Sequence, residues 1–514
     1  MMHEPSDLLV LALVLPVAGL VLALVAGGRH AGRIALLLTP VGLAVAATIV
    51  VAVVRADEAL VYHLGGWTPP LGVALRADGL SAILLLTTAA IIGATGWFAR
   101  TEFRPAPGQI EARASLAFWT LLLALWGALN LVFLGNDLFT LFVALELLTF
   151  SAVPLVCLDG RAGTLEAALR YLLFALFGSV LYLLGVVLLY GAYGTLDIGL
   201  LSGLIQREPI ALAAAALMTV GLLAKTALFP LHLWLPPAHA GAPAAASAVL
   251  SALVVKASFF LIVRLWFDVM PELMNPTAAQ VLGALGAAAI LFGGVLALRQ
   301  ARLKMLIAYS TVAQIGYLFL VFPLITRPES VPFAAADLAT ELVALEVSTS
   351  AWSGGALQAV SHAFAKAAMF LAAGLIAQRL GHDRIADLGG VGRALPITVL
   401  AFGLAGMSLM GLPPSGGFAA KWLLLAATIE TGQWWWSLVI LGGGLLTGGY
   451  LFRVLAPVLA GASAPASLHA PVARSRELVV LALALCSVLI GFVRLGAFDL
   501  VQIGRLATAG MGLP

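Results

Sequence analysis

Residues 212–237 read LAAAALMTVGLLAKTALFPLHLWLPP, an apolar run that carries one lysine, Lys225, and is interrupted at Pro230 and again at Pro236-Pro237. About 20 consecutive apolar residues are enough to cross a lipid bilayer. Proline removes a backbone donor and clashes with the preceding helical turn, so we expect a membrane helix with this sequence to break inside the bilayer. The run therefore predicts a discontinuous membrane helix with an ionisable side chain near the break.

The composition places the whole chain in the same class. Of its 514 residues, 62% are hydrophobic and 10% are charged, which predicts an all-α polytopic membrane protein. The two cysteines, Cys157 and Cys486, lie in apolar stretches without neighbours at metal-ligand spacing. A disulfide framework, a zinc site and an iron–sulfur cluster are therefore not expected. We expect this chain to bind no metal and no cofactor, and to contact no nucleic acid.

The same length criterion gives fourteen predicted membrane spans along the chain. The seventh and the twelfth are too long to be single helices, and the twelfth is interrupted at Gly411-Leu-Pro-Pro414. Both are expected to be discontinuous, for the reason given above. The predicted spans are residues 8–27, 32–54, 79–98, 114–135, 137–157, 167–192, 210–236, 243–266, 277–298, 304–323, 354–378, 395–429, 435–452 and 478–497.

Lysine is scarce, and its placement is the main indication of function. The chain has 5 lysines against 22 arginines, and four of the lysines lie within predicted spans: Lys225, Lys256, Lys366 and Lys421. An ionisable side chain in the hydrocarbon region costs roughly 3 kcal/mol by insertion scales, so it usually faces a protein interior or a water-filled path. Desolvation lets a lysine lose its charge, whereas an arginine stays protonated. These four positions therefore predict a proton pathway.

Three further titratable residues belong to the predicted pathway. Glu146 lies in the fifth span with no charged residue within eight positions, and Lys225 is its best candidate partner. His362 and Lys366 are four residues apart and share one helical face. His232 is a candidate link between Lys225 and Lys256.

Each of these assignments has a structural alternative. Glu146 and His362 can be polar residues satisfied by helix packing, and His232 can fill a packing role. Lys225 and Lys256 can extend toward a membrane interface, and Lys421 can cap the broken twelfth span.

The distribution of basic residues gives an orientation. Of the 27 arginines and lysines, 16 fall in alternate loops on one side, 7 on the side that includes both termini, and four within the spans. By the positive-inside rule, both termini are expected on the non-cytoplasmic side. The longest loop on that side, residues 324–352, is acidic and is expected to contact a partner or to form a short surface helix.

The two broken spans lie five positions apart, each with a lysine near its break. This pattern predicts two five-helix inverted repeats, formed by spans 4–8 and 9–13. The expected domains are an N-terminal three-helix segment (1–110), the first repeat (111–270), the second repeat (271–460) and a C-terminal helix with its tail (461–514).

Four stretches together resemble a known family. They are 224–256, which begins AKTALFPLHLWLP, LKMLIAYSTVAQIGY at 303–317, SHAFAKA at 361–367 and GLPPSGGFAAK at 411–421. They resemble motifs of the proton-translocating antiporter-like membrane subunits of respiratory complex I, Mrp-type Na+/H+ antiporters and membrane-bound hydrogenases. One departure is Pro237, where relatives often carry a polar or acidic residue.

The resemblance implies roles for the residues already selected. Glu146 and Lys225 would be the interacting pair, Lys256 the central relay, His362 and Lys366 the relay of span eleven, and Lys421 the terminal group. It also implies other membrane subunits as partners, a bacterial-type plasma membrane, and protons as the transported ion. Na+ coordination by backbone carbonyls at the breaks stays open.

Two other functions are alternatives to a proton-translocating subunit. One is a membrane subunit of a proton-coupled system for inorganic carbon uptake, and the other is a quinone-binding redox enzyme.

Overall fold

The protein is an all-α polytopic membrane protein. A computed structural model describes residues 5–104, 113–326, 338–459, 469–493 and 495–505. Thirteen helices among them are long and apolar enough to cross a membrane. The twelfth predicted span falls outside this number because its break divides it into two helices of 15 residues each. Large apolar side chains such as Val25, Leu445 and Phe452 are exposed, as expected for a surface in contact with lipid.

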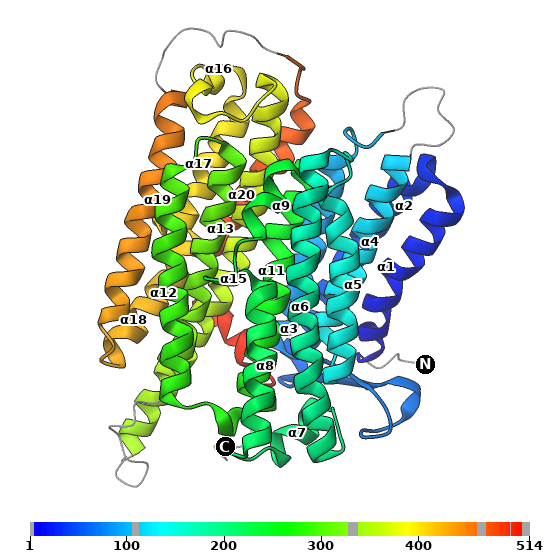
Figure 1. The fold of residues 1–514 in the computed structure, drawn as a ribbon, viewed down its shortest axis with the longest axis vertical. Coiled ribbons are helices and arrows are strands. Elements are labelled where there is room, and N and C mark those ends of the chain that lie inside the picture. Colours follow the sequence, from blue (N-terminus) through cyan, green and yellow to red (C-terminus); the bar gives the residue numbers. More distant parts are fainter. Residues whose placement is uncertain (1–4, 105–112, 327–337, 460–468, 494, 506–514) are drawn as a thin grey trace. The chain divides into compact units, whose positions relative to one another are not determined.

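The described chain divides into two compact units. The first comprises the described residues within 1–226, 241–274 and 500–514, and the second those within 227–240 and 275–499. In the first unit, α4, α5 and α6 run alongside one another (Figure 1). Its helices are α1 (Asp7–Ala26), α2 (Gly28–Ala56), α3 (Gly79–Ala99), α4 (Arg113–Leu134), α5 (Leu138–Val156), α6 (Ala162–Tyr193), α7 (Ile198–Leu204), α8 (Pro209–Thr226), α10 (Ala244–Val249) and α11 (Val255–Arg264).

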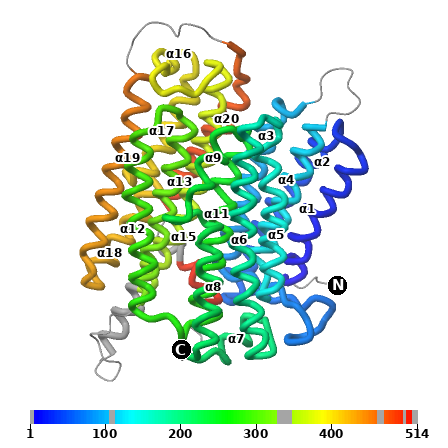
Figure 2. Tube along the Cα trace, viewed as in Figure 1, coloured from blue at the N-terminus to red at the C-terminus, as the bar shows by residue number. Residues whose placement is uncertain are grey.

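The second unit is also helical. Its chain can be followed from α12 to α20 in Figure 2, where the colour passes from green through yellow to orange. Its helices are α9 (Leu235–Gly241, apart from its last residue), α12 (Pro276–Arg299), α13 (Leu303–Phe319), α14 (Val321–Ile325), α15 (Leu338–Leu380), α16 (Val391–Ala394), α17 (Pro396–Met410), α18 (Gly416–Glu430), α19 (Trp435–Leu459) and α20 (Arg474–Leu489).

Both predicted breaks are present. Helix α8 ends at Thr226, the next residue, Ala227, has a left-handed backbone with φ of 57°, and α9 begins only at Leu235. Helix α17 ends at Met410, where Gly411 has φ of 87°, and α18 begins at Gly416. The positive φ at Gly411 is one that glycine adopts without steric cost. The prediction of two discontinuous spans is confirmed, whereas the inverted relation of the repeats stays a prediction.

A third irregularity is one that proline does not mark. In the eighth span, α10 and α11 are joined by a π-helical turn, η2 (Leu250–Val254), and a second π-helical turn, η3 (Leu265–Val269), follows α11. Turns of this kind occur frequently at functional sites because they disturb the regular pattern of helical hydrogen bonds. Here the first one directly precedes the helix that carries Lys256.

Some connections are more structured than the sequence indicates. Strand β1 (Leu60–His63) pairs antiparallel with β2 (Ala74–Ala77) in the connection between the second and third spans. The predicted loop 324–352 is only partly a loop, because α15 already begins at Leu338. No glycine or proline lies between Leu338 and Ser353, so nothing in the sequence stops the helix there. The other part of that loop, 327–337, lies outside the described residues.

Paired glycines let neighbouring helices approach closely in each unit. In the first unit, a methyl group added to Gly221 of α8 would overlap the carbonyl oxygen of Gly178 in α6. In the second unit, one added to Gly316 of α13 would overlap the carbonyl oxygen of Gly286 in α12. Small residues at such contacts are typical of membrane helices, which associate mainly through van der Waals packing. The contact between α6 and α8 places α8, and hence Lys225, beside α6.

We therefore predict that Gly221→Ala lowers the stability of the protein by about 1–3 kcal/mol, because the added methyl group must push α6 and α8 apart. Gly191→Ala in α6 is the control, since a methyl group there meets no atom within 4 Å. Thermal unfolding of the detergent-solubilised protein measures both. Equal melting temperatures for the two variants would contradict the close packing described here.

Candidate functional site

The first unit contains a carboxylate–ammonium pair formed by two residues of the predicted pathway. Glu146 of α5 and Lys225 of α8 approach to 3.6 Å between Oε1 and Nζ. The Lys225 side chain is 5% exposed and the Glu146 side chain 19%. Ser179 of α6 donates a hydrogen bond to the Glu146 carboxylate. The structure thus brings together the two residues that the sequence predicted to interact.

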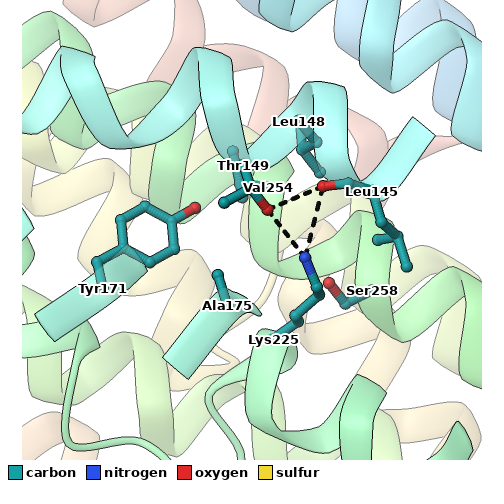
Figure 3. A pocket seen from close by; sticks show the side chains of 8 residues that line it. All are labelled: Leu145, Leu148, Thr149, Tyr171, Ala175, Lys225, Val254 and Ser258. Atoms are coloured by element: carbon teal, nitrogen blue, oxygen red, sulfur yellow. Dashed lines mark hydrogen bonds between the residues drawn. The ribbon is translucent and has the colours of Figure 1, made fainter. Parts of the chain in front are cut away.

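Lys225 has neutral partners as well. Its Nζ donates to Thr149 Oγ1 at 2.9 Å and to the Leu145 carbonyl at 3.5 Å, and Thr149 donates to the same carbonyl (Figure 3). The hydroxyl is therefore nearer to the ammonium than the carboxylate is. An ammonium has three donors and no acceptor, so these partners can satisfy it without a close contact to Glu146.

A small cavity lies against Lys225. Leu145, Leu148, Thr149, Tyr171, Ala175, Lys225, Val254 and Ser258 line it (Figure 3). The space for the centre of a water molecule in it is about 10 Å³, close to what one water requires. Val254 and Ser258 come from η2 and α11, so the cavity extends from Lys225 to the helix that carries Lys256.

Lys256 is buried, and its ammonium donates to the carbonyl of Ser251 at 2.8 Å. Ser251 belongs to the π-helical turn η2. The irregular turn therefore supplies a backbone acceptor to a lysine that has no ion-pair partner among the described residues.

In the second unit, Lys366 and His362 lie one turn apart on α15, and both are almost completely buried. The Lys366 ammonium donates to the hydroxyl of Ser310 and to the carbonyl of Ile307, the latter at 3.1 Å. Sequence reasoning missed His239 of α9. This histidine is fully buried and stacks on Phe370, with ring centroids 4.5 Å apart. It also interacts electrostatically with Lys366. A histidine in the apolar run that follows the break was the signal available for it.

Lys421 occupies the second break. Its Nζ donates to the carbonyls of Leu409 at 2.6 Å and Met410 at 3.2 Å. In an unbroken helix these two carbonyls would accept from the residues four positions later, Pro413 and Pro414, which have no N–H. The two prolines thus leave the acceptors that hold the ammonium. Its Nζ also lies 4.4 Å from the centroid of the Tyr317 ring, a cation–π contact.

His232 lies in the segment between α8 and α9. The centroid of its ring is 5.7 Å from that of Phe229, 5.5 Å from that of Phe292 and 6.5 Å from that of Tyr309, all in the second unit. These contacts describe an aromatic packing position. A place between Lys225 and Lys256 stays a prediction.

The sequence of the chain matches a known protein family. The model for the membrane domain described as NADH:quinone oxidoreductase/Mrp antiporter covers residues 135–329 and 334–447. The chain belongs to this family. All seven predicted pathway residues lie within the matched residues, from Glu146 to Lys421.

Individual relatives in the family agree with this assignment. NADH-quinone oxidoreductase subunit N of Desulforudis audaxviator is 35% identical over 77% of this chain and 74% of its own length. A Na(+)/H(+) antiporter subunit of Alkalihalophilus pseudofirmus is 28% identical over 86% of this chain and 85% of its own length. A chain of the Mrp complex from Dietzia sp. DQ12-45-1b has the same fold, with a TM-score of 0.83, 23% identity, and coverage of 98% of this chain and 97% of that one.

A second group of buried charged side chains was not found from the sequence. Some of its members lie outside the residues that the family model matches. Arg264, which falls within the predicted eighth span, is buried at the end of α11. Its Nη1 lies 2.5 Å from an oxygen of Asp78 and 2.6 Å from one of Asp268, and Arg76 approaches Asp78 to 3.3 Å. Two carboxylates therefore compensate the charge of Arg264 inside the protein.

Asp78 caps the N-terminus of α3 by accepting from the Ser81 N–H at 2.9 Å. Burial by itself would raise the pKa of this carboxyl, but the guanidinium of Arg264, with smaller contributions from Arg76 and the Ser81 N–H, lowers it to about 2. A carboxylate with a depressed pKa stabilises the fold above its unfolded-state pKa of about 3.9, and this contribution is lost as the pH falls through the folded-state value.

We therefore predict that Asp78→Asn lowers stability by about 3 kcal/mol, because it leaves the buried Arg264 with one carboxylate. The loss should be the same at every pH from about 5 to 8, since Asp78 is ionised throughout that range. Asp57→Asn, at an exposed position of the same unit, is the control. Thermal unfolding at several pH values tests this; an Asp78→Asn protein that melts like the wild type would show that the charge cluster does not stabilise the fold.

Proposed function

We propose that this chain moves protons through a relay of Glu146, Lys225, Lys256, His362, Lys366 and Lys421, as an antiporter-like subunit of a larger membrane complex. Four buried lysines carry the proposal, because carbonyls, hydroxyls and, at Lys225, a carboxylate hold their ammonium groups. Groups of this kind can gain and lose protons, whereas arginine stays charged. Membership of the NADH:quinone oxidoreductase/Mrp antiporter family agrees with this function.

The Glu146–Lys225 pair is the proposed point of control. Lys225 lies closer to Thr149 than to Glu146, so a small movement of its ammonium exchanges a neutral partner for a charged one. Because two interacting sites titrate as a unit, the position of Glu146 determines how readily Lys225 releases its proton. The cavity beside Lys225 has room for one water that would carry this proton toward α11 and Lys256.

The names of the relatives suggest the partners. One relative is a subunit of an NADH-quinone oxidoreductase and another a subunit of a Na(+)/H(+) antiporter. We propose that this chain likewise works with other membrane subunits, in a bacterial-type plasma membrane, and needs no cofactor of its own. Either a redox reaction or Na+ exchange would drive it, and a flux measurement distinguishes the two. His232 remains a candidate relay residue.

We also propose the repeat arrangement expected from the sequence, with domains 1–110, 111–270, 271–460 and 461–514. Support comes from the division between the two units at Met274 and Asn275, close to the predicted boundary, and from the presence of one broken span per proposed repeat. Carbon uptake and quinone chemistry, the two alternatives, find no support in the family match or in the relatives named above.

The proposal predicts that Glu146→Gln and Lys225→Ala each lower proton flux by roughly tenfold or more, because each removes one member of a proton-transferring pair. The measurement uses inverted membrane vesicles that contain the native complex at matched expression. Glu166→Gln is the control, since Glu166 is exposed and pairs with Arg170 within α6.

The type of flux that is lost identifies the complex. Loss of ΔpH formation with a redox substrate would indicate a redox-driven pump, and loss of Na+-dependent ΔpH dissipation would indicate an antiporter. If both variants retain wild-type flux, the buried pair is structural and the proposed function is wrong.

The orientation gives a separate prediction. Both termini are expected on the non-cytoplasmic side, since 16 of the 27 basic residues lie in loops on the opposite side. Alkaline phosphatase fused to the C-terminus of the full chain should therefore be active in cells, and a green fluorescent protein fused there should not fluoresce. The reverse result would place the C-terminus in the cytoplasm.

A further inference from the structure

One backbone carbonyl in the second unit has two side-chain donors. The carbonyl of Leu409, freed by Pro413, accepts from Lys421 at 2.6 Å and from Nε2 of Gln314 at 3.1 Å. Gln314 lies on α13 and is fully buried. The ammonium of a proposed relay residue and a neutral amide therefore share the same acceptor.

The amide of Gln314 is held in one orientation. Its Nε2 donates a second hydrogen bond to Thr447 Oγ1 at 3.3 Å, and its Oε1 accepts from Nε2 of Gln358 at 3.1 Å. Reversing the amide would place donor against donor and acceptor against acceptor, so these contacts fix which end faces Leu409. Buried amides are costly unless their hydrogen bonds are made, and here both ends are satisfied.

The same contacts extend to the other buried lysine of this unit. Tyr450 of α19 donates from its hydroxyl to Thr447 Oγ1 at 3.3 Å, and Ser310 is a further polar side chain that interacts with that hydroxyl. Ser310 accepts from Lys366. A series of neutral polar groups therefore lies between Lys366 and Lys421, in the order Ser310, Tyr450, Thr447, Gln314 and the Leu409 carbonyl.

The direction of the hydrogen bonds limits what this series does. The Leu409 carbonyl accepts from both sides and has no proton to pass on, and Thr447 Oγ1 accepts from both Gln314 and Tyr450 while it donates to the carbonyl of Gly443. A proton cannot hop through such a chain without a rearrangement. The series therefore fixes the position and polarity of groups around Lys421.

We propose that Gln314 is a positioning residue for proton release from Lys421. It donates to the Leu409 carbonyl and so competes with the Lys421 ammonium for that acceptor. Thr447, Tyr450 and Ser310 lie between Gln314 and Lys366. The inference rests on the proposed function, because it assigns a role to the relay at Lys421. When Lys421 loses its proton, Gln314 keeps the carbonyl satisfied, so the deprotonated state leaves no buried acceptor without a donor.

The other titratable groups near Lys421 come from several elements. Tyr317 from α13 lies under the ammonium, Tyr450 from α19 belongs to the series, and Lys366 and His362 come from α15. Glu430, at the end of α18, is exposed. Helices α14 and α17 carry no titratable side chain, and α20 carries Arg474, Arg476 and Glu477 in its first turn and the exposed Cys486. Within the described residues, Lys421 makes no ion pair.

The test is the pH profile of proton flux by the native complex in vesicles, for wild type and Gln314→Met. Methionine has a similar volume but no donor, so the ammonium form of Lys421 no longer shares the Leu409 carbonyl. Flux should reach half of its maximum at a pH about 0.5–1 unit higher than in the wild type. A shift of this size corresponds to the free energy of one neutral hydrogen bond. Gln280→Met is the matched control, because it breaks another amide–amide pair of the same unit, to Gln433, away from Leu409.

A second variant keeps the test decisive if Gln314→Met does not assemble. Gln358→Met leaves Gln314 in place and removes the donor that orients its amide, so it should shift the profile in the same direction by less. Unchanged profiles in the assembled variants would overturn the inference. Lys421→Met separates this outcome from failure of the proposed function. If Lys421→Met abolishes flux while the glutamine variants keep the wild-type profile, only the positioning role of Gln314 is wrong. If Lys421→Met retains flux, Lys421 is not part of the relay.

Discussion

A buried ammonium needs acceptors, and in this protein backbone carbonyls provide them at all four lysines. Leu145, Ser251, Ile307 and Leu409 each supply one carbonyl to a lysine. Regular helices use their carbonyls internally, so carbonyls are most available where the helix is irregular. The proline break at Met410 and the π-helical turn before Lys256 are such places. At Lys256 and Lys421, the position of the lysine and the irregularity of the helix therefore depend on each other, whereas Leu145 and Ile307 lie within the regular helices α5 and α13.

The four sites differ in their remaining partners. Lys225 has the carboxylate of Glu146 at 3.6 Å, which is farther away than the neutral hydroxyl of Thr149 at 2.9 Å. Lys366 and Lys421 have hydroxyl and carbonyl partners and are joined by neutral groups that include Gln314. Charge interaction thus dominates at one end of the proposed relay and hydrogen-bond competition at the other. This difference is the reason for proposing that the Glu146–Lys225 pair is the point of control.

The sequence was sufficient for the features that strong local signals determine. Apolar runs indicated the membrane spans, and Pro230 and Pro413-Pro414 indicated the breaks. The small number of lysines and their positions within apolar runs identified them as candidate functional residues. It was insufficient where tertiary contacts decide. The π-helical turn at Leu250–Val254 contains no proline or glycine, and Gln314 and Tyr450 are ordinary residues of apolar helices until their partners are known. The ion pair of Arg264 with Asp78 could not be predicted because the two residues lie far apart in the sequence.

The central claim is that the buried lysines release and accept protons, and substitution by arginine tests it most directly. Arginine keeps the positive charge but does not deprotonate in proteins. Proton flux would be measured in vesicles for Lys225→Arg, with Lys304→Arg, at a partly exposed position, as the control for the substitution itself. The account predicts that Lys225→Arg assembles and loses proton flux while Lys304→Arg keeps it. Wild-type flux in Lys225→Arg would show that a fixed positive charge is sufficient and would contradict the account.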